Sequence, residues 1–134
     1  MTFEESNYSK LSHYKLVKPF GTFYFLETFI ISELNDGVHF DWEMIKDAMS
    51  ELINFYGNDI KLVYISNRVN SYSMNPQTWI TVAQDYDIIV ANAIVTYNKM
   101  AYMNAKLEKK YTNMNINHFL TLDEAINWAL KFTL

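Results

Sequence analysis

One apolar segment restricts the fold of this chain more than any other feature. Every residue from Ile88 to Val95 is apolar except Asn92, and the sequence stays largely apolar to Tyr97. A strand with one face in water alternates apolar and polar residues, whereas a continuous apolar run is typical of a strand buried on both faces of a parallel sheet. The run is also about half as long as the ~20 residues that a membrane-spanning helix needs. Residues 88–97 therefore predict a central strand, in a sheet that helices cover.

Strand and helix patterns alternate along the rest of the chain. Short runs of β-branched and aromatic residues predict further strands at residues 14–18, 22–26, 29–34, 60–66 and 116–120. Apolar residues at helical spacing predict helices at residues 42–56, 76–85, 98–111 and from 122 onward. This order predicts an α/β fold with a mixed, mostly parallel sheet, an N-terminal antiparallel β-meander and about four helices. Periodicity does not say which face of the sheet each helix covers.

Capping residues mark where several of these helices begin and end. Asp41 precedes the first helix as a good N-cap, and Gly57 follows that helix as a C′ residue. Residues 75–76, Asn-Pro, are typical of an N-cap and a first helical residue. Thr121 and Glu124 have the spacing of a capping box, which predicts the start of the last helix.

The chain has the size of one domain. Its 134 residues are 50% hydrophobic and 19% charged, a composition typical of a globular protein. Residues 1–13 are polar and predict a flexible N-terminal tail, so we expect a single domain over residues 14–134. The chain contains no cysteine, which excludes disulfides, thiolate metal sites and cysteine nucleophiles. Because the tail has no signal-peptide pattern, we expect a cytoplasmic protein.

The charge pattern argues against nucleic-acid binding. The net charge is −4 and Arg68 is the single arginine, whereas nucleic-acid-binding proteins gather Lys and Arg on one face. The densest basic run, Lys106, Lys109 and Lys110, is interleaved with Glu108 and is typical of a solvated helix face. The apolar residues on one side of this predicted helix are Met100, Met103, Leu107 and Tyr111.

The sequence contains no recognisable catalytic or metal-binding motif. The three glycines stand singly at positions 21, 37 and 57, so neither a P-loop nor a Rossmann fingerprint is present. No Gly-x-Ser-x-Gly sequence surrounds Ser66, which follows a predicted strand. His39 and Asp41 supply two metal ligands at best, and a metal site needs three or four. We therefore expect no enzymatic activity, no metal and no cofactor.

Six short stretches carry a family resemblance. They are FYF (23–25), FIISE (29–33), GVHFD (37–41), YISNR (64–68), NSYS (70–73) and LDEA (122–125). Together with the element order, they resemble the STAS-type anti-sigma-factor antagonist family, and in particular small bacterial proteins of its SpoIIAA-like branch. The resemblance implies a STAS-like α/β domain with a regulatory role through a protein partner. The broader SpoIIAA-like group has also been likened to small lipid-binding domains.

The loop from Ser66 to Pro76 is the candidate functional site. It follows the carboxyl end of a predicted central strand and precedes a helix, which is where open α/β sheets usually bind ligands. The candidate ligand- or partner-binding residues are Ser66, Asn67, Arg68, Asn70 and Tyr72. The resemblance implies a phosphorylated Ser or Thr in this loop, for which Ser71 and Ser73 are the candidates, although the family's Asp-Ser-Ser-Gly motif is absent.

Three interpretations of this loop stay open. In the first, it binds a protein partner, and phosphorylation adds a charge of about −1.5 to −2; a homodimer is also left open. In the second, it binds a small ligand, a lipid or another anionic amphiphile, whose anionic group is held by Arg68 and by the free N–H groups of the next helix. In the third, Arg68 pairs with a nearby carboxylate and the other polar side chains satisfy the loop backbone.

Overall fold

A computed structural model describes residues 1–111 and 115–132 of the chain. The strands are β1 (Tyr14–Lys18), β2 (Gly21–Phe25), β3 (Phe29–Leu34), β4 (Leu62–Asn67), β5 (Ile89–Val95) and β6 (Asn115–Phe119). The helices are α1 (Trp42–Tyr56), α2 (Thr78–Asp85), α3 (Lys99–Lys109), α4 (Leu122–Lys131) and a short 3₁₀ helix, η1 (Asn7–Lys10). The predicted α/β fold is confirmed, with helix and strand bounds that differ from the predicted ones by about two residues at most sites.

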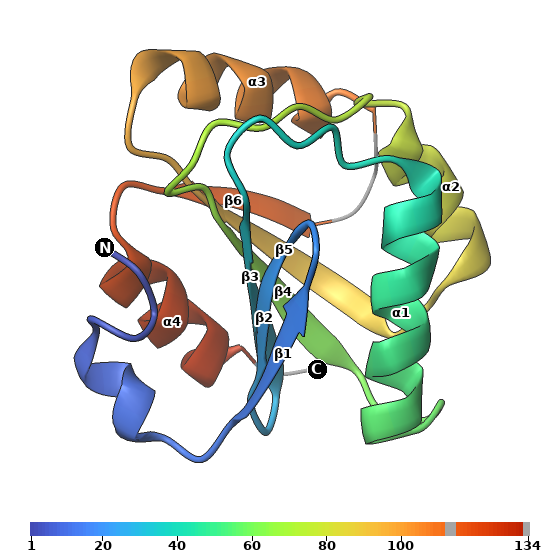
Figure 1. The fold of residues 1–134 in the computed structure, drawn as a ribbon, viewed down its shortest axis with the longest axis vertical. Helices are drawn as coiled ribbons and strands as arrows, with labels where there is room; N and C mark the ends of the chain where they lie inside the picture. The colour runs from blue at the N-terminus through green and yellow to red at the C-terminus, as the bar shows by residue number, and fades with distance from the viewer. Residues whose placement is uncertain (112–114, 133–134) are drawn as a thin grey trace.

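The six strands form one mixed sheet in the order β1-β2-β3-β4-β5-β6 (Figure 1). β1 to β3 pair antiparallel as the predicted meander, and β3 to β6 pair parallel. The apolar strand β5 lies between β4 and β6, with its side chains buried on both faces of the sheet. The continuous apolar run therefore has the position that it predicts.

Helices cover both faces of the sheet but are divided unequally. Each new parallel strand is added on the same side of the previous one, and right-handed crossovers then place α1, α2 and α3 on the same face. α4 and the N-terminal segment pack on the opposite face (Figure 1). The side chains of β4 alternate between these two faces, so Tyr64 and Ser66 point toward α1–α3 while Ile65 and Asn67 point toward α4.

The N-terminal segment is packed against the sheet, which differs from the predicted flexible tail over residues 1–13. Phe3 is 0% exposed and belongs to the core under α4. Its backbone N–H donates to the Glu33 carboxylate on β3 (2.8 Å), and the Asn67 amide donates to the carbonyl of Met1 (3.0 Å). The sequence did not predict this packing, because one buried phenylalanine and a few hydrogen bonds to distant residues leave no periodic pattern in a polar segment.

Local capping signals act as the sequence predicts for α1 and α4. The Asp41 side chain accepts a hydrogen bond from the backbone N–H of Met44 (3.0 Å), and Thr121 accepts one from the N–H of Glu124 (3.2 Å). Gly57 ends α1 with a φ of 87°, a left-handed conformation that glycine adopts without strain. These caps fix both ends of α1 and the start of α4.

α2 begins two residues later than its proline predicts. The Asn75 side chain accepts from the backbone N–H of Gln77 (3.0 Å), so it closes a turn, and helical geometry starts at Thr78. The loop between β4 and α2 therefore covers residues 68–77, whereas the predicted segment runs from Ser66 to Pro76.

Candidate functional site

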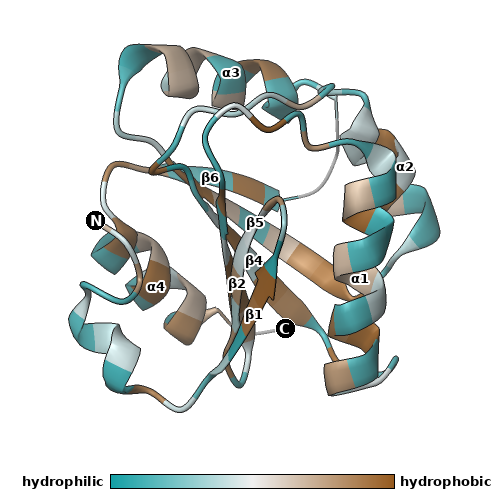
Figure 2. Ribbon diagram, in the orientation of Figure 1, coloured by the Kyte–Doolittle hydropathy of each residue, from teal (hydrophilic) through white to brown (hydrophobic). Residues whose placement is uncertain are grey.

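An apolar cavity lies between the sheet and the helices α1 and α2. Its volume is about 60 Å³, counted as the space that the centre of a water molecule can occupy. The apolar side chains around it are Phe23, Phe25, Ile30, Phe40, Ile45, Ala48, Met49, Leu52, Met74, Trp79, Val82 and Ile89. Figure 2 shows hydrophobic residues on the strands, whereas α1 alternates between hydrophobic and hydrophilic residues.

The size of the cavity sets the size of what it can hold. One water needs about 10–15 Å³ on this measure and about 30 Å³ of liquid volume, so the cavity has room for roughly four to six waters. That is close to the volume of a single hydrocarbon ring, and apolar cavities of this scale take apolar ligands rather than water. The flexible side chains of Met49 and Met74 line the cavity and allow it to adjust.

Polar side chains line the cavity at one end. They belong to Tyr64 and Ser66 on β4 and to Arg68 and Tyr72 in the following loop. The Ser66 hydroxyl and the Tyr72 hydroxyl are 2.8 Å apart, and the Tyr64 hydroxyl is 2.6 Å from that of Ser32. Burial raises the pKa values of Tyr64 and Tyr72 above the ordinary tyrosine value, so both phenols stay protonated at neutral pH.

Each of these two hydroxyl pairs keeps one proton to donate. Two hydroxyl groups carry two protons, and the hydrogen bond between them uses one. Arg68 Nε donates to the Ser66 oxygen (3.2 Å), and this contact consumes an acceptor position rather than a proton. Among the described residues, nothing accepts the remaining proton of either pair. Ser66 and Tyr72 both line the cavity, so their pair offers a neutral hydrogen-bond donor to an oxygen or nitrogen of a ligand.

Arg68 is held in a buried ion pair with Glu108 of α3. Its Nη1 and Nη2 atoms donate to the two carboxylate oxygens at 2.6 and 2.7 Å, and the two residues are 7% and 3% exposed. The Trp79 indole N–H donates to the same carboxylate (3.0 Å). Burial acts to lower the pKa of Arg68, but Tyr72 and Glu108 outweigh it and hold the pKa above its ordinary value. The pairing predicted for Arg68 in the third interpretation is confirmed, and its charge is already matched.

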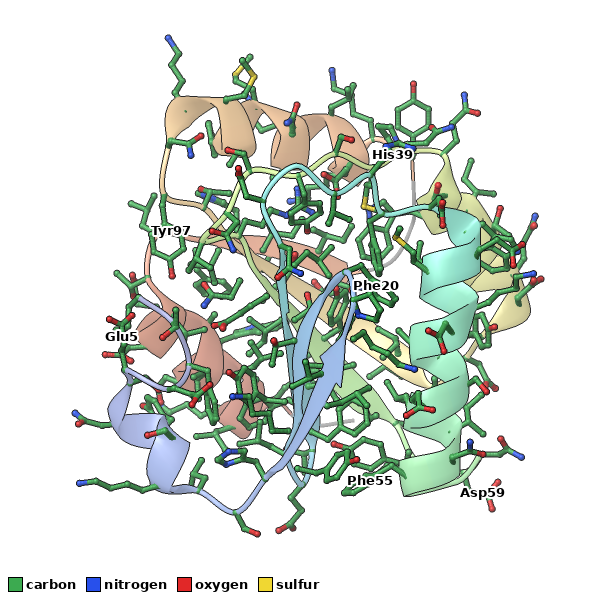
Figure 3. All side chains as sticks on the ribbon, in the orientation of Figure 1. Glu5, Phe20, His39, Phe55, Asp59 and Tyr97 are labelled. Atoms are coloured by element: carbon green, nitrogen blue, oxygen red, sulfur yellow. The ribbon has the colours of Figure 1, made fainter. Side chains whose placement is uncertain are left out.

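Two loops border the cavity at the carboxyl ends of β3 and β4. The backbone of Ser73 donates to Val38 (2.9 Å) and accepts from Phe40 (2.8 Å), so the two loops pair like short parallel strands. The His39 ring nitrogen lies 2.8 Å from the Ser73 hydroxyl, at the outer surface that is labelled in Figure 3. Phe40 and Met74, next to these residues, point inward and line the cavity.

The structure separates the predicted site residues into two groups. Ser66, Arg68 and Tyr72 come together at the cavity. Asn67 points to the opposite face, where it donates to the Glu33 carboxylate (2.7 Å), and Asn70 lies at the surface and donates to the carbonyl of Leu34. Ser71 and Ser73, the two phosphorylation candidates, are exposed.

The apolar cavity reaches from the predicted loop to the space beneath the helices. Open α/β sheets bind ligands at the carboxyl edge where neighbouring crossovers go to opposite faces and leave a crevice. Here α1, α2 and α3 all lie on one face, so the parallel strands contain no such point. Besides the apolar cavity between α1 and the sheet, a pocket of about 80 Å³ lies at the predicted loop, lined by Asn70, Ser71 and Tyr72 and by the start of α3.

Sequence reasoning missed two features of this face of the sheet. The apolar stripe of α1 was visible as Ile45, Met49 and Leu52, but nothing local shows that this stripe faces a cavity. Asn92 on β5 is buried, on the same face as Tyr64 and next to it in register, and its amide has no hydrogen-bond partner among the described residues. An unpaired buried amide costs about 1–3 kcal/mol of stability.

Comparisons and searches for other kinds of site gave no further assignment. The sequence matches no family model, no curated protein and no solved structure. Within residues 1–111 and 115–132, no group of three or more His, Asp or Glu side chains is placed to hold a metal ion. In the same part of the chain, no helix has the length and apolar character needed to cross a membrane. The resemblance to STAS proteins stays a prediction.

Proposed function

We propose that this domain binds a small, mostly apolar, uncharged molecule in the cavity between the sheet and α1. The observation that carries the proposal is an apolar cavity whose one polar end presents the hydroxyl pair of Ser66 and Tyr72. The ligand is of the size of a single ring and carries one hydrogen-bond acceptor. This is the second interpretation of the sequence, with the anionic group replaced by a neutral one.

The matched charge of Arg68 is the reason for a neutral ligand. A carboxylate or phosphate in this cavity would lose its hydration, and the one cation at the wall is already engaged by the two oxygens of Glu108. A buried charge without a free partner costs several kcal/mol, whereas a neutral hydroxyl or carbonyl can accept from Tyr72 or Ser66 at little cost.

The first interpretation, a regulatory protein partner at the Ser66–Pro76 loop, stays a prediction, as does the cytoplasmic location. Asn70, Ser71 and Ser73 are exposed and remain open to such a partner. The three side chains at the cavity are not available to it, because Ser66 and Arg68 are buried and Tyr72 is largely covered.

An NMR titration tests the proposal. Benzyl alcohol added to the isotope-labelled protein is expected to shift the methyl signals of Ile45, Leu52 and Ile89, which surround the cavity. Ala48→Phe fills the cavity from α1 and is expected to abolish these shifts. Ala83→Phe places the same ring on an exposed position of α2 and is the matched control, for which the shifts should persist.

Two outcomes would overturn the proposal. One is an absence of saturable shifts at these methyl groups in a folded wild-type protein. The other is an equal response in the Ala48→Phe and Ala83→Phe variants, because the ligand would then occupy a different site. If Ala48→Phe fails to fold, Ala48→Leu fills less of the cavity and should weaken the binding in the same direction.

A further inference from the structure

α3 is attached to the rest of the molecule through a narrow face. Among its eleven residues, Ala105 and Glu108 are the buried ones. Ala105 packs with Ile94 and Ile116 of the sheet, and Glu108 is held by Arg68. Figure 1 shows α3 along the outside of the fold, so most of its surface faces away from the protein.

The outward side of α3 carries an apolar stripe. Met100, Met103 and Leu107 are 71%, 52% and 44% exposed. Their spacing of three and four residues places them on one side of the helix, where they form a continuous row. The apolar row predicted from the sequence therefore exists, but it points to solvent and leaves the buried side to an alanine and a glutamate.

A row of lysines lies beside this apolar stripe. Lys99, Lys106 and Lys110 are exposed at helical spacing next to it, and Lys109 is exposed further around the helix. The sequence pattern suggested that Glu108 offsets these charges, but Glu108 is buried against Arg68 and does not reach the surface. The outer side of α3 is therefore cationic on a protein whose net charge is −4.

We propose that α3 docks the protein on the surface of an anionic lipid bilayer. A helix that lies in the interface buries a row of apolar side chains among the acyl chains and keeps its lysines at the head groups, with their long stems reaching outward. Each lysine near an anionic leaflet strengthens binding about fivefold. The four lysines and three long apolar side chains of α3 have this arrangement.

The composition of the surface favours a bilayer over an acidic protein. Protein interfaces are depleted in lysine and depend on Trp, Tyr and Arg anchors in fitted pockets. The outer side of α3 has no tryptophan or arginine, and its exposed tyrosine, Tyr102, packs on His118 of β6 and beside Lys106. The other exposed side chains are those of Met, Leu, Lys and Asn. Such side chains suit a fluid surface that does not require fitted contacts.

Vesicle co-sedimentation tests this proposal. The wild-type protein is expected to sediment with phosphatidylcholine vesicles that contain phosphatidylserine and not with pure phosphatidylcholine vesicles, and high salt should release it. Lys106→Gln with Lys110→Gln should weaken the partition by about 25-fold. The matched control removes the same charge elsewhere, through Lys46→Gln with Lys61→Gln on α1 and before β4, and should leave the partition largely unchanged.

The apolar contribution is tested by Met103→Gln with Leu107→Gln. Both side chains are exposed, so these changes should preserve the fold and weaken binding to the phosphatidylserine vesicles. The proposal is overturned if the wild type does not bind these vesicles, or if the α3 variants and the control variants bind equally. A third result would also overturn it: the wild type binds soluble polyglutamate but no vesicles, and the α3 variants lose the polyglutamate binding. The partner would then be an acidic protein. None of these results depends on the cavity, which the Ala48→Phe variant alters separately.

Discussion

Glu33 is the buried carboxyl group that most clearly links a single residue to the stability of the fold. It lies on β3, where its Oε2 atom accepts hydrogen bonds from the backbone of Phe3 (2.8 Å) and from the Asn67 amide (2.7 Å). Burial raises the pKa of Glu33 above its ordinary value of 4.5, although both hydrogen bonds act in the opposite direction. The folded protein therefore retains a proton on Glu33 at a pH where the unfolded chain has lost it.

This difference predicts a pH-dependent effect of Glu33→Gln. As the pH rises from 4.5 through the raised pKa of Glu33, the free energy of unfolding of the wild type should fall, because the folded state binds the proton more tightly. The variant cannot titrate at this position. The free energy of unfolding of the variant, minus that of the wild type, should therefore increase across this pH window and level off above it.

Urea unfolding between about pH 4 and about pH 7 measures this difference. Glu27→Gln, at an exposed position in the turn between β2 and β3, is the control for the loss of one negative charge. A difference between Glu33→Gln and the wild type that stays constant or decreases with rising pH would contradict the assigned environment of Glu33.

At the scale of secondary structure elements, α3 depends on one long-range contact. Its buried Glu108 pairs with Arg68, 40 residues earlier in the chain, and this pair also receives the Trp79 indole. Ala105 is the other buried side chain of α3, so the ion pair is one of the few buried contacts between this helix and the rest of the fold. It also links α3 to the wall of the cavity.

Removing one partner of this pair should lower the free energy of unfolding more than removing both. Arg68→Met or Glu108→Leu alone leaves an unpaired buried charge and should lower the free energy of unfolding by about 3–5 kcal/mol. The double variant replaces the pair with apolar side chains and should lose clearly less than the sum of the single losses. Chemical denaturation of the four proteins closes this double-mutant cycle, and additive losses would show that the two residues do not act as a pair.

The elements themselves could be predicted from local signals. Asp41, Gly57 and Thr121 act within one turn of their own helix, so the sequence alone locates the ends of α1 and the start of α4. The orientation of α3 could not be predicted this way. An apolar row on a helix usually faces the sheet, but the row of α3 faces solvent. Glu108 is on the buried side of α3 instead, because it pairs with Arg68, which is distant in the sequence.

At the scale of the whole molecule, strand order decides where a ligand can bind. The alternation of strands and helices predicts the α/β fold correctly, because each apolar run has to be buried by its neighbours. The same pattern does not fix which face each helix covers, and the position of the cavity follows from α1 and α2 sharing one face. The predicted loop contributes Ser66, Arg68 and Tyr72 to the site, while the apolar walls come from α1, α2 and the sheet.

The central claim is that the polar end of the apolar cavity binds a neutral group. A comparison of a neutral ligand with an anionic one tests this claim most directly. Isothermal titration with benzyl alcohol and with benzoate, which match in size, compares a neutral and an anionic head at the same polar end. Because Glu108 already neutralises Arg68, benzyl alcohol should bind at least about tenfold more tightly than benzoate. Equal or tighter binding of benzoate would show that Arg68 is free to receive an anion and would contradict the proposed site.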